Sequence, residues 1–305
     1  MTGTGRPEGR PYTDGGGGNA NDAKRTQAEM NFREKLEAAW GRSDSMLCVG
    51  LDPELTLMPD GYGVDDVAAF NIAIIEATHD LVCAYKPNVA FYEALGPERG
   101  YAALRRTLAA IPAHVITLAD AKRGDVEHTA RAYVRAIYDD LGFDAATVNP
   151  YLGRDSVEPW IERADKGAFV VCRTSNPGAP DFQDLPVQPE GGTRPLYEVV
   201  AERATSWDRH GNVGLVVGAT YPDEMRRLRA LCPDTTFLVP GIGAQAGSLE
   251  EAVRAGIDAR GRGMLISASR GVTYASKGAD FAAAARAAAI KLRDEIRACA
   301  AAVRA

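Results

Sequence analysis

Residues 115–149, VITLADAKRGDVEHTARAYVRAIYDDLGFDAATVN, contain the pattern that decides the fold. A short apolar run at 115–120 is followed by an amphipathic stretch at 127–142 and then by a second apolar run at 145–149. Short β-branched runs that alternate with amphipathic stretches of about ten to twenty residues are typical of parallel strands joined by helices. This segment therefore predicts one strand–helix–strand unit of a parallel sheet.

The same alternation recurs along most of the chain. Eight apolar runs are each followed by a helical pattern, which predicts an α/β fold of the closed (β/α)8 type, the TIM barrel. An open doubly wound sheet is the alternative, because one sequence alone does not settle the strand count. The predicted strands are 46–51, 82–87, 115–120, 145–149, 168–173, 213–218, 236–240 and 264–268. The predicted helices are 64–81, 97–110, 127–142, 154–164, 195–207, 222–231, 248–256 and 279–303.

The N-terminal residues differ in composition from the rest. Residues 1–24 are Gly-rich and polar, so burial of side chains cannot offset the entropy lost on ordering them. We predict a disordered tail over 1–24 and a single barrel domain over 25–305. Helical spacing at 27–40 predicts a helix before the first strand, with Gly41 as its stop.

The composition argues against nucleic acid, membranes and metal ions as partners. The net charge of −6 and the pI of about 5.4 argue against a broad basic surface for nucleic acid. No apolar run approaches the roughly 18 residues of a membrane span, and no targeting segment is visible, so we expect a cytoplasmic protein without a membrane partner. The 5 cysteines lack a CxxC pair and the 4 histidines lack zinc-ligand spacing, so we predict no metal site.

The strongest local motif is DAKRGD at 120–125, which follows the third predicted strand. Alternate residues of a strand point to the same side, so Asp120 and Lys122 are expected to share the barrel mouth, with Asp125 in the loop beyond. A solvated turn is the alternative interpretation. Lys86 ends the second predicted strand, where a lysine in an apolar run is costly unless it is paired. The four side chains would form a row of alternating charges that keeps each group ionised.

Two glycine-containing turns follow the last two predicted strands. VPGIGAQAG at 239–247 and SASRG at 267–271 lie where TIM barrels commonly bind phosphate. Backbone N–H groups of Gly241 and Gly243 and the guanidinium of Arg270 are the candidate phosphate ligands. Ordinary turns are the alternative.

Eight motifs occur in order between about residue 46 and residue 276. They are LCVGLDPEL, AYKPNVAFYEALG, LADAKRGDVEHTA, TVNPYLG, CRTSNPGA, VGLVVGAT, VPGIGAQAG and ISASRGVTYAS. Together they resemble the bacterial long-form orotidine 5'-phosphate decarboxylases, which implies conversion of orotidine 5'-phosphate to uridine 5'-phosphate without a cofactor. Lys122 would then donate the proton to C6 of the pyrimidine, Asp120 would lie against the departing carboxylate, and Lys86 would orient Asp120 and contact the ribose.

The resemblance also implies roles for residues outside the DAKRGD motif. Asp125 and Thr129 would reach across a homodimer interface toward the ribose hydroxyls of the partner's site. Asp52 would accept a ribose hydrogen bond, Gln245 would bridge the phosphate and the base, and Ser175 would hydrogen-bond the pyrimidine amide. The chain departs from the family at Ser269, where glycine often precedes the arginine, and this places one backbone contact in doubt.

Residues 176–194 are too rich in proline and glycine for the sequence to predict a helix or a strand. A lid over the active site and a surface insertion are the two interpretations.

Three rival functions stay open: a magnesium-dependent sugar-phosphate lyase or aldolase of the same barrel superfamily, a non-catalytic nucleotide-binding barrel, and a membrane or nucleic-acid adaptor that uses the terminal helix or the basic stretch at 123–135.

Overall fold

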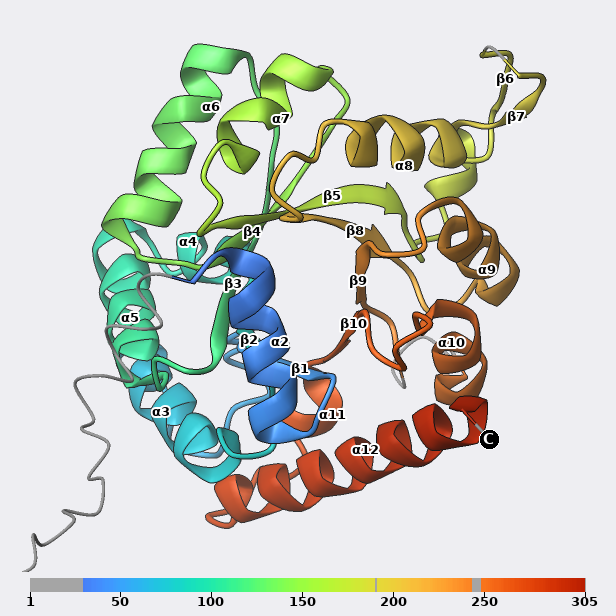
Figure 1. Ribbon diagram of the computed structural model, residues 1–305. Helices are drawn as coiled ribbons and strands as arrows, with labels where there is room; N and C mark the ends of the chain where they lie inside the picture. The colour runs from blue at the N-terminus through green and yellow to red at the C-terminus, as the bar shows by residue number, and fades with distance from the viewer. Residues whose placement is uncertain (1–29, 190, 243–247, 305) are drawn as a thin grey trace, which may run out of the picture.

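A computed structural model describes residues 30–189, 191–242 and 248–304, and its centre is a closed barrel of eight parallel strands (Figure 1). The strand order around the barrel is β1-β10-β9-β8-β5-β4-β3-β2. All eight predicted strands are confirmed, and the open-sheet alternative is wrong. Their bounds are β1 Leu47–Gly50, β2 Ala84–Lys86, β3 Ile116–Arg123, β4 Ala145–Val148, β5 Gly167–Arg173, β8 Val213–Val217, β9 Thr236–Val239 and β10 Met264–Ala268.

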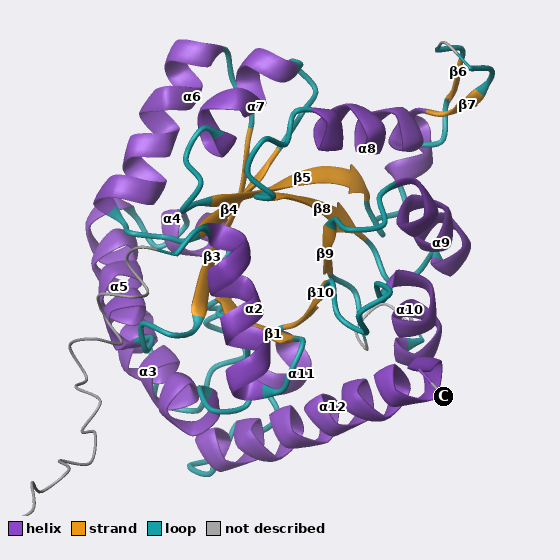
Figure 2. Ribbon diagram, in the orientation of Figure 1, coloured by secondary structure: helices purple, strands orange, loops and turns teal. Residues whose placement is uncertain are grey.

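Helices surround the barrel on its outer side (Figure 2). Two of the helices begin with proline at the first helical position, where the missing N–H costs nothing, and these match their predicted ranges. The helices are α2 Phe32–Ser43, α3 Val67–Thr78, α4 Val89–Glu93, α5 Pro97–Ala110, α6 Glu127–Val134, α7 Arg154–Ile161, α8 Leu196–Ser206, α9 Pro222–Leu231, α10 Leu249–Gly256, α11 Arg270–Thr273 and α12 Phe281–Arg304. A 3₁₀ turn, η1 Val64–Asp66, precedes α3, and a π-helical segment, η2 Arg135–Asp140, continues α6. None of the described helices is long and apolar enough to cross a membrane.

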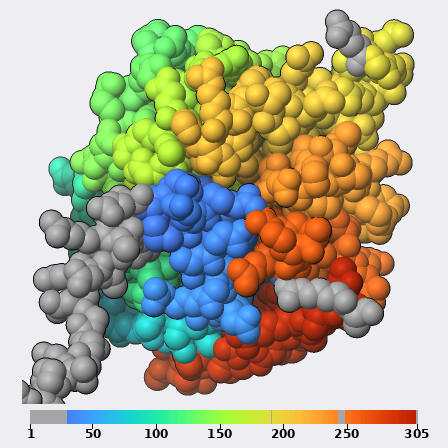
Figure 3. Space-filling model, in the orientation of Figure 1, coloured from blue at the N-terminus to red at the C-terminus, as the bar shows by residue number. Residues whose placement is uncertain are grey.

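Helix α2 covers the end of the barrel at which the strands begin, and its residues occupy the centre of this face in Figure 3. The Phe32 backbone N–H donates to the Ala164 carbonyl at 2.7 Å. The Phe32 ring lies so close to β5 that a Cβ at Gly167 would approach the ring to 2.3 Å. The helix passes through Gly41 and ends at Ser43, and its C-cap Asp44 has a left-handed φ of 44°. The predicted stop at Gly41 is therefore wrong, because packing outweighs the cost of about 1 kcal/mol for glycine inside a helix.

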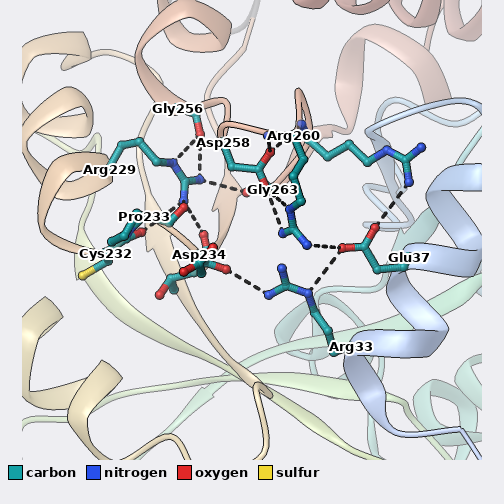
Figure 4. A network of polar contacts seen from close by, with 12 residues as sticks. Arg33, Glu37, Arg229, Cys232, Pro233, Asp234, Gly256, Asp258, Arg260 and Gly263 are labelled. Carbon is teal, nitrogen blue, oxygen red and sulfur yellow. Dashed lines mark hydrogen bonds and ion pairs between the residues drawn. The ribbon is translucent and has the colours of Figure 1, made fainter.

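A polar network ties α2 to the loops before β9 and β10 (Figure 4). Glu37 on α2 pairs with Arg33, Arg260 and Arg262. Arg229 lies over the Phe237 ring at 3.9 Å, and burial lowers the pKa of its guanidinium to about 10. Its N–H groups donate to the carbonyls of Cys232, Pro233, Thr235, Gly256 and Gly263. These contacts close the strand-start end, which leaves the opposite end of the barrel for a site.

The segment at 176–194 contains regular structure that the sequence did not predict. A 3₁₀ turn, η3 Ala179–Asp181, is followed by a short antiparallel hairpin of β6 Pro186–Val187 and β7 Arg194–Pro195. Proline is tolerated here because the hairpin lies outside the barrel and the missing N–H groups need no neighbour. The prediction of neither helix nor strand over 176–194 is thus wrong.

The predicted tail at 1–24 lies outside the described residues, and the single-domain division stays a prediction.

Candidate active site

A bulge in β3 sets the position of the DAKRGD motif. Ala119 pairs with Ala146 and Arg123 pairs with Val148, so four steps along β3 face two steps along β4. Lys122 lies inside this bulge with a left-handed φ of 47°. The sequence correctly placed Asp120 and Lys122 together, but simple strand alternation is not the reason. The bulge turns the lysine back toward the aspartate.

Lys86, Asp120 and Lys122 form a contiguous cluster of charges where β2 and β3 end. Lys86 Nζ lies 2.8 Å from Asp120 Oδ2, and Lys122 Nζ lies 2.5 Å from Asp120 Oδ1. The side chains of Lys86 and Asp120 are only 6% and 10% exposed, whereas that of Lys122 is 49% exposed. Lys122 is therefore the more accessible of the two ammonium groups to a ligand at the mouth.

The charges hold one another in the ionised form. Burial alone would raise the pKa of Asp120, but Lys86 and Lys122 outweigh burial and hold that pKa well below its usual range. Burial alone would lower the pKa of Lys86, but Asp52 and Asp120 outweigh burial and raise it above its usual value. The site at neutral pH thus contains a fixed carboxylate and a fixed ammonium before any ligand arrives.

Asp52 follows β1 and is held by residues of two neighbouring segments, the loop after β2 and the ends of α11. Its Oδ1 accepts from the Asn88 N–H at 3.0 Å, and its Oδ2 accepts from the Ser269 hydroxyl at 2.8 Å. Its carbonyl accepts from the Tyr274 hydroxyl at 2.7 Å, and burial raises the pKa of Tyr274 to about 12. A Cβ at Gly50 would lie 1.9 Å from Ser269 Oγ, so this approach requires glycine. Sequence reasoning missed the Ser269 hydroxyl as a partner of Asp52.

Asp125 and Thr129 do not join the charge cluster. Asp125 is half-buried, and its Oδ1 accepts from the adjacent Val126 N–H at 2.8 Å. Thr129 lies in the first turn of α6 and is also half-buried. The predicted row of four charges is therefore wrong within one chain: three members meet, because the bulge brings Lys122 back to Asp120 while the chain continues into α6 with Asp125.

The phosphate-binding candidates lie at the ends of the neighbouring strands β9 and β10. Gly241 follows β9 with a φ of 99°, a conformation that favours glycine. Arg270 begins α11, which the sequence did not predict, and its side chain is exposed. Arg270 takes part in none of the ion pairs found among the described residues. Gly243 and Gln245 lie outside the described residues.

Ser175 lies beside the end of β8, since a Cβ at Gly218 would approach Ser175 Cβ to 2.8 Å. The loop that begins here is anchored at its base. Arg173 is 1% exposed, its Nη2 donates to Asp184 Oδ2 at 3.1 Å, and its guanidinium lies 4.0 Å from the Tyr221 ring centroid. The Thr174 N–H donates to Gln183 Oε1 at 2.8 Å. Sequence reasoning missed this anchor, which leaves the hairpin as the part of 176–194 that projects from the barrel (Figure 1).

Thr147 on β4 was also missed, although it lies in the TVNPYLG motif. Its hydroxyl donates to Asp120 Oδ1 at 3.0 Å and accepts from the N–H groups of Ala121 and Lys122 at 3.0 and 2.9 Å.

Across the described part of the chain, no group of three or more His, Cys, Asp and Glu side chains is placed to hold a metal ion.

Comparison with known proteins adds an independent line of support. A model of the "Orotidine 5'-phosphate decarboxylase / HUMPS family" matches residues 45–288. Orotidine 5'-phosphate decarboxylase from Thermomicrobium roseum is 52% identical over 270 residues, which cover 88% of this chain and 95% of that protein. The Dehalococcoides mccartyi enzyme of the same name is 51% identical over 267 residues, covering 88% of this chain and 97% of that protein.

Solved structures agree with the sequence relatives. The OMP decarboxylase of Leishmania donovani superposes with a TM-score of 0.78 at 44% identity, covering 89% of this chain and 99% of that one. A putative orotidine-monophosphate-decarboxylase from Toxoplasma gondii gives a TM-score of 0.83 at 38% identity, covering 90% of this chain and 97% of that one. With its closed barrel, its paired lysines around Asp120 and relatives that match it over nearly their full length, the chain belongs to the orotidine 5'-phosphate decarboxylase / HUMPS family.

Proposed function

We propose that this chain converts orotidine 5'-phosphate to uridine 5'-phosphate and carbon dioxide, a step of pyrimidine nucleotide synthesis. The observation that carries the proposal is the ionised Lys86–Asp120–Lys122 cluster at the barrel mouth. Relatives that share about half of their residues with this chain bear the name of that activity. We propose the cytoplasm as the place of the reaction.

Lys122 acts on the reacting carbon of the pyrimidine. When the bond between C6 and the carboxylate breaks, its electron pair stays on C6 and carbon dioxide leaves. The Lys122 ammonium stabilises the developing negative charge and then transfers one proton to C6. The neutral amine regains a proton from solvent. Because the ammonium is already positioned, little reorganisation is needed when the charge develops.

Asp120 and Lys86 support this step. Asp120 lies against the substrate carboxylate, and the repulsion between the two carboxylates disappears as neutral carbon dioxide departs. Preorganised charge around C6 supplies the larger part of the stabilisation. Lys86 keeps Asp120 ionised, fixes its orientation and contacts the ribose.

The remaining predicted residues bind the nucleotide. Asp52 accepts a hydrogen bond from a ribose hydroxyl, and Ser175 contacts the pyrimidine amide. Gln245 bridges the base and the phosphate. The phosphate itself is held by Arg270 and by backbone N–H groups of Gly241 and Gly243. Closure of 176–194 over the bound nucleotide stays a prediction.

A homodimer completes the site in this proposal. Asp125 and Thr129 would lie near the ribose of the partner's active site. Support comes from apolar side chains exposed on the same adjoining loops after β3 and β4: Val126 is 43%, Tyr151 83% and Leu152 46% exposed. Covering such side chains is a common role of subunit contacts.

The main alternative is a magnesium-dependent sugar-phosphate lyase or aldolase. Lys86 disfavours it, because a metal-binding acid is expected at the end of β2 in that chemistry. The decisive assay follows the loss of orotidine 5'-phosphate absorbance with and without EDTA. We expect turnover that survives chelation. Turnover abolished by EDTA would favour the lyase, and nucleotide binding without release of carbon dioxide would favour a non-catalytic barrel.

A further inference from the structure

We infer that Thr147 is a positioning residue for the decarboxylation, because its one hydroxyl holds the β3 bulge that presents both Asp120 and Lys122. The inference rests on the proposed roles of those two residues. Thr147 is not expected to touch the substrate, since its side chain is directed into the bulge and the residue is 1% exposed.

The hydroxyl uses its full hydrogen-bonding capacity on the bulge. The hydroxyl donates to Asp120 Oδ1, with 3.0 Å between the two oxygens. It accepts from the N–H groups of Ala121 and Lys122, whose nitrogens lie 3.0 and 2.9 Å from Thr147 Oγ1. A hydroxyl has one donor and two acceptor positions, so all three are satisfied. The rest of β4 offers only alanine and valine side chains. Thr147 is therefore the one β4 side chain able to make these bonds.

These bonds replace the ladder that the bulge interrupts. Between the paired positions Ala119 and Arg123, β3 has more residues than β4 can pair with backbone groups. Two of the freed N–H groups would be unsatisfied without the Thr147 hydroxyl, and an unsatisfied buried donor is costly.

The same bonds hold an unfavourable backbone conformation. Lys122 has a φ of 47°, a region that a lysine adopts at a cost because its Cβ crowds the following carbonyl. Such a conformation persists only where its surroundings enforce it. The hydrogen bond from the Lys122 N–H to Thr147 acts on the strained residue itself, and it thereby sets the direction of the side chain that ends 2.5 Å from Asp120.

The consequence concerns geometry at the reacting atoms. The Thr147 hydroxyl contacts the Asp120 carboxylate directly and Lys122 through its backbone, so loss of that hydroxyl frees both groups at once. Misplacement of a catalytic group by about 1 Å can cost about 100-fold in rate. Nucleotide affinity, which depends on the ribose and phosphate contacts, is affected much less.

The test compares Thr147→Val, which keeps the shape and removes the hydroxyl, with Thr147→Ser, which keeps the hydroxyl. Thr117→Val is the matched control. The Thr117 hydroxyl likewise bonds a carboxylate and a backbone N–H, both of Asp144, but near the start of β3. For each variant, kcat and KM for orotidine 5'-phosphate, the Kd of uridine 5'-phosphate and the thermal midpoint are measured.

We expect Thr147→Val to lower kcat by about 10- to 100-fold while the Kd of uridine 5'-phosphate changes less than about threefold. Thr147→Ser should keep kcat within about threefold of the parent, and Thr117→Val should lower the thermal midpoint with kcat unchanged. If Thr147→Val does not fold, Thr147→Cys replaces it, and its weaker thiol bonds should place its kcat below that of Thr147→Ser.

Three outcomes would overturn the inference. They are a parental kcat in the variant without the hydroxyl, an equal loss in Thr147→Ser, and an equal loss in Thr117→Val. Lys122→Ala is assayed beside them. If Lys122→Ala turns over like the parent, the proposed lysine mechanism fails. If Lys122→Ala is inactive while Thr147→Val is fully active, only the positioning role fails.

Discussion

Replacement of Lys86 by methionine tests how strongly the buried charge pair contributes to folding. Methionine retains much of the apolar stem but removes the ammonium that lies 2.8 Å from Asp120 Oδ2. The Asp120 carboxylate, only 10% exposed, would lose one of its two cationic partners. Removing one member of a buried pair costs about 3–5 kcal/mol, because the other charge stays buried without compensation.

Because Asp120 keeps other partners in Lys86→Met, we expect the loss of stability to lie near the lower end of this range. Asp120 keeps Lys122 Nζ at 2.5 Å and the Thr147 hydroxyl at 3.0 Å. We therefore expect Lys86→Met to lower the free energy of unfolding by about 3 kcal/mol at neutral pH. At about 2 °C per kcal/mol for a chain of this size, the thermal midpoint should fall by about 6 °C.

Urea unfolding followed by circular dichroism measures this loss. Lys291→Met is the control, because Lys291 is 79% exposed and its removal should change stability by less than about 0.5 kcal/mol. In the double variant Lys86→Met/Asp120→Leu both charges are gone, so part of the stability should return. A Lys86→Met protein within about 1 kcal/mol of the parent, or a double variant less stable than Lys86→Met, would refute the reasoning.

Three further predictions concern the nucleotide, the subunits and pH. Arg270→Ala should raise KM by about 10- to 100-fold through loss of charge-assisted phosphate bonds, with Arg254→Ala on α10 as the unchanged control; equal KM values would remove Arg270 from the phosphate site. Mixed Asp125→Ala and Lys122→Ala subunits should recover up to about a quarter of parental activity, since each mixed dimer has one intact site; no recovery would place both residues in one subunit's site. Because the pKa of Asp120 lies below its ordinary value, its stabilising effect is complete above about pH 4 and is lost as the pH falls through the folded-state pKa. Asp120→Asn should therefore flatten the decline of the urea midpoint below about pH 4, and an unchanged decline would contradict the ion pair.

The sequence predicted the barrel well because the signals for strands and helices are local. Each strand is a short apolar run between helical patterns, and α5 and α9 begin at Pro97 and Pro222, where a proline marks the first turn. The helix stop predicted at Gly41 was wrong because that prediction also used only the local sequence. The packing of α2 against the strand-start end of the barrel is a long-range contact, and the sequence around Gly41 does not reveal it.

The candidate site was predicted in its residue types more than in its geometry. Lys86, Asp120 and Lys122 could be identified because charges at the ends of apolar strands need partners. The bulge in β3 could not be predicted, because it depends on Thr147, which lies 25 residues from Lys122 in the sequence. The bond between Ser269 and Asp52 spans 217 residues, so no local pattern indicates it.

Asp125 shows a different limit. The row of alternating charges was inferred from proximity in sequence, but the chain continues into α6 after the bulge, and Asp125 bonds its own neighbour, Val126. A partner supplied by a second subunit would leave no pattern in one chain.

The most direct test of the lysine mechanism is single-turnover decarboxylation by Lys122→Ala, together with the Kd of uridine 5'-phosphate. We expect the rate to fall by at least about 1,000-fold, because the variant loses both the charge that stabilises the carbanion and the proton that quenches it. Binding of the product should stay within about threefold of the parent. A variant that releases carbon dioxide at more than a tenth of the parental rate would contradict the assignment of Lys122.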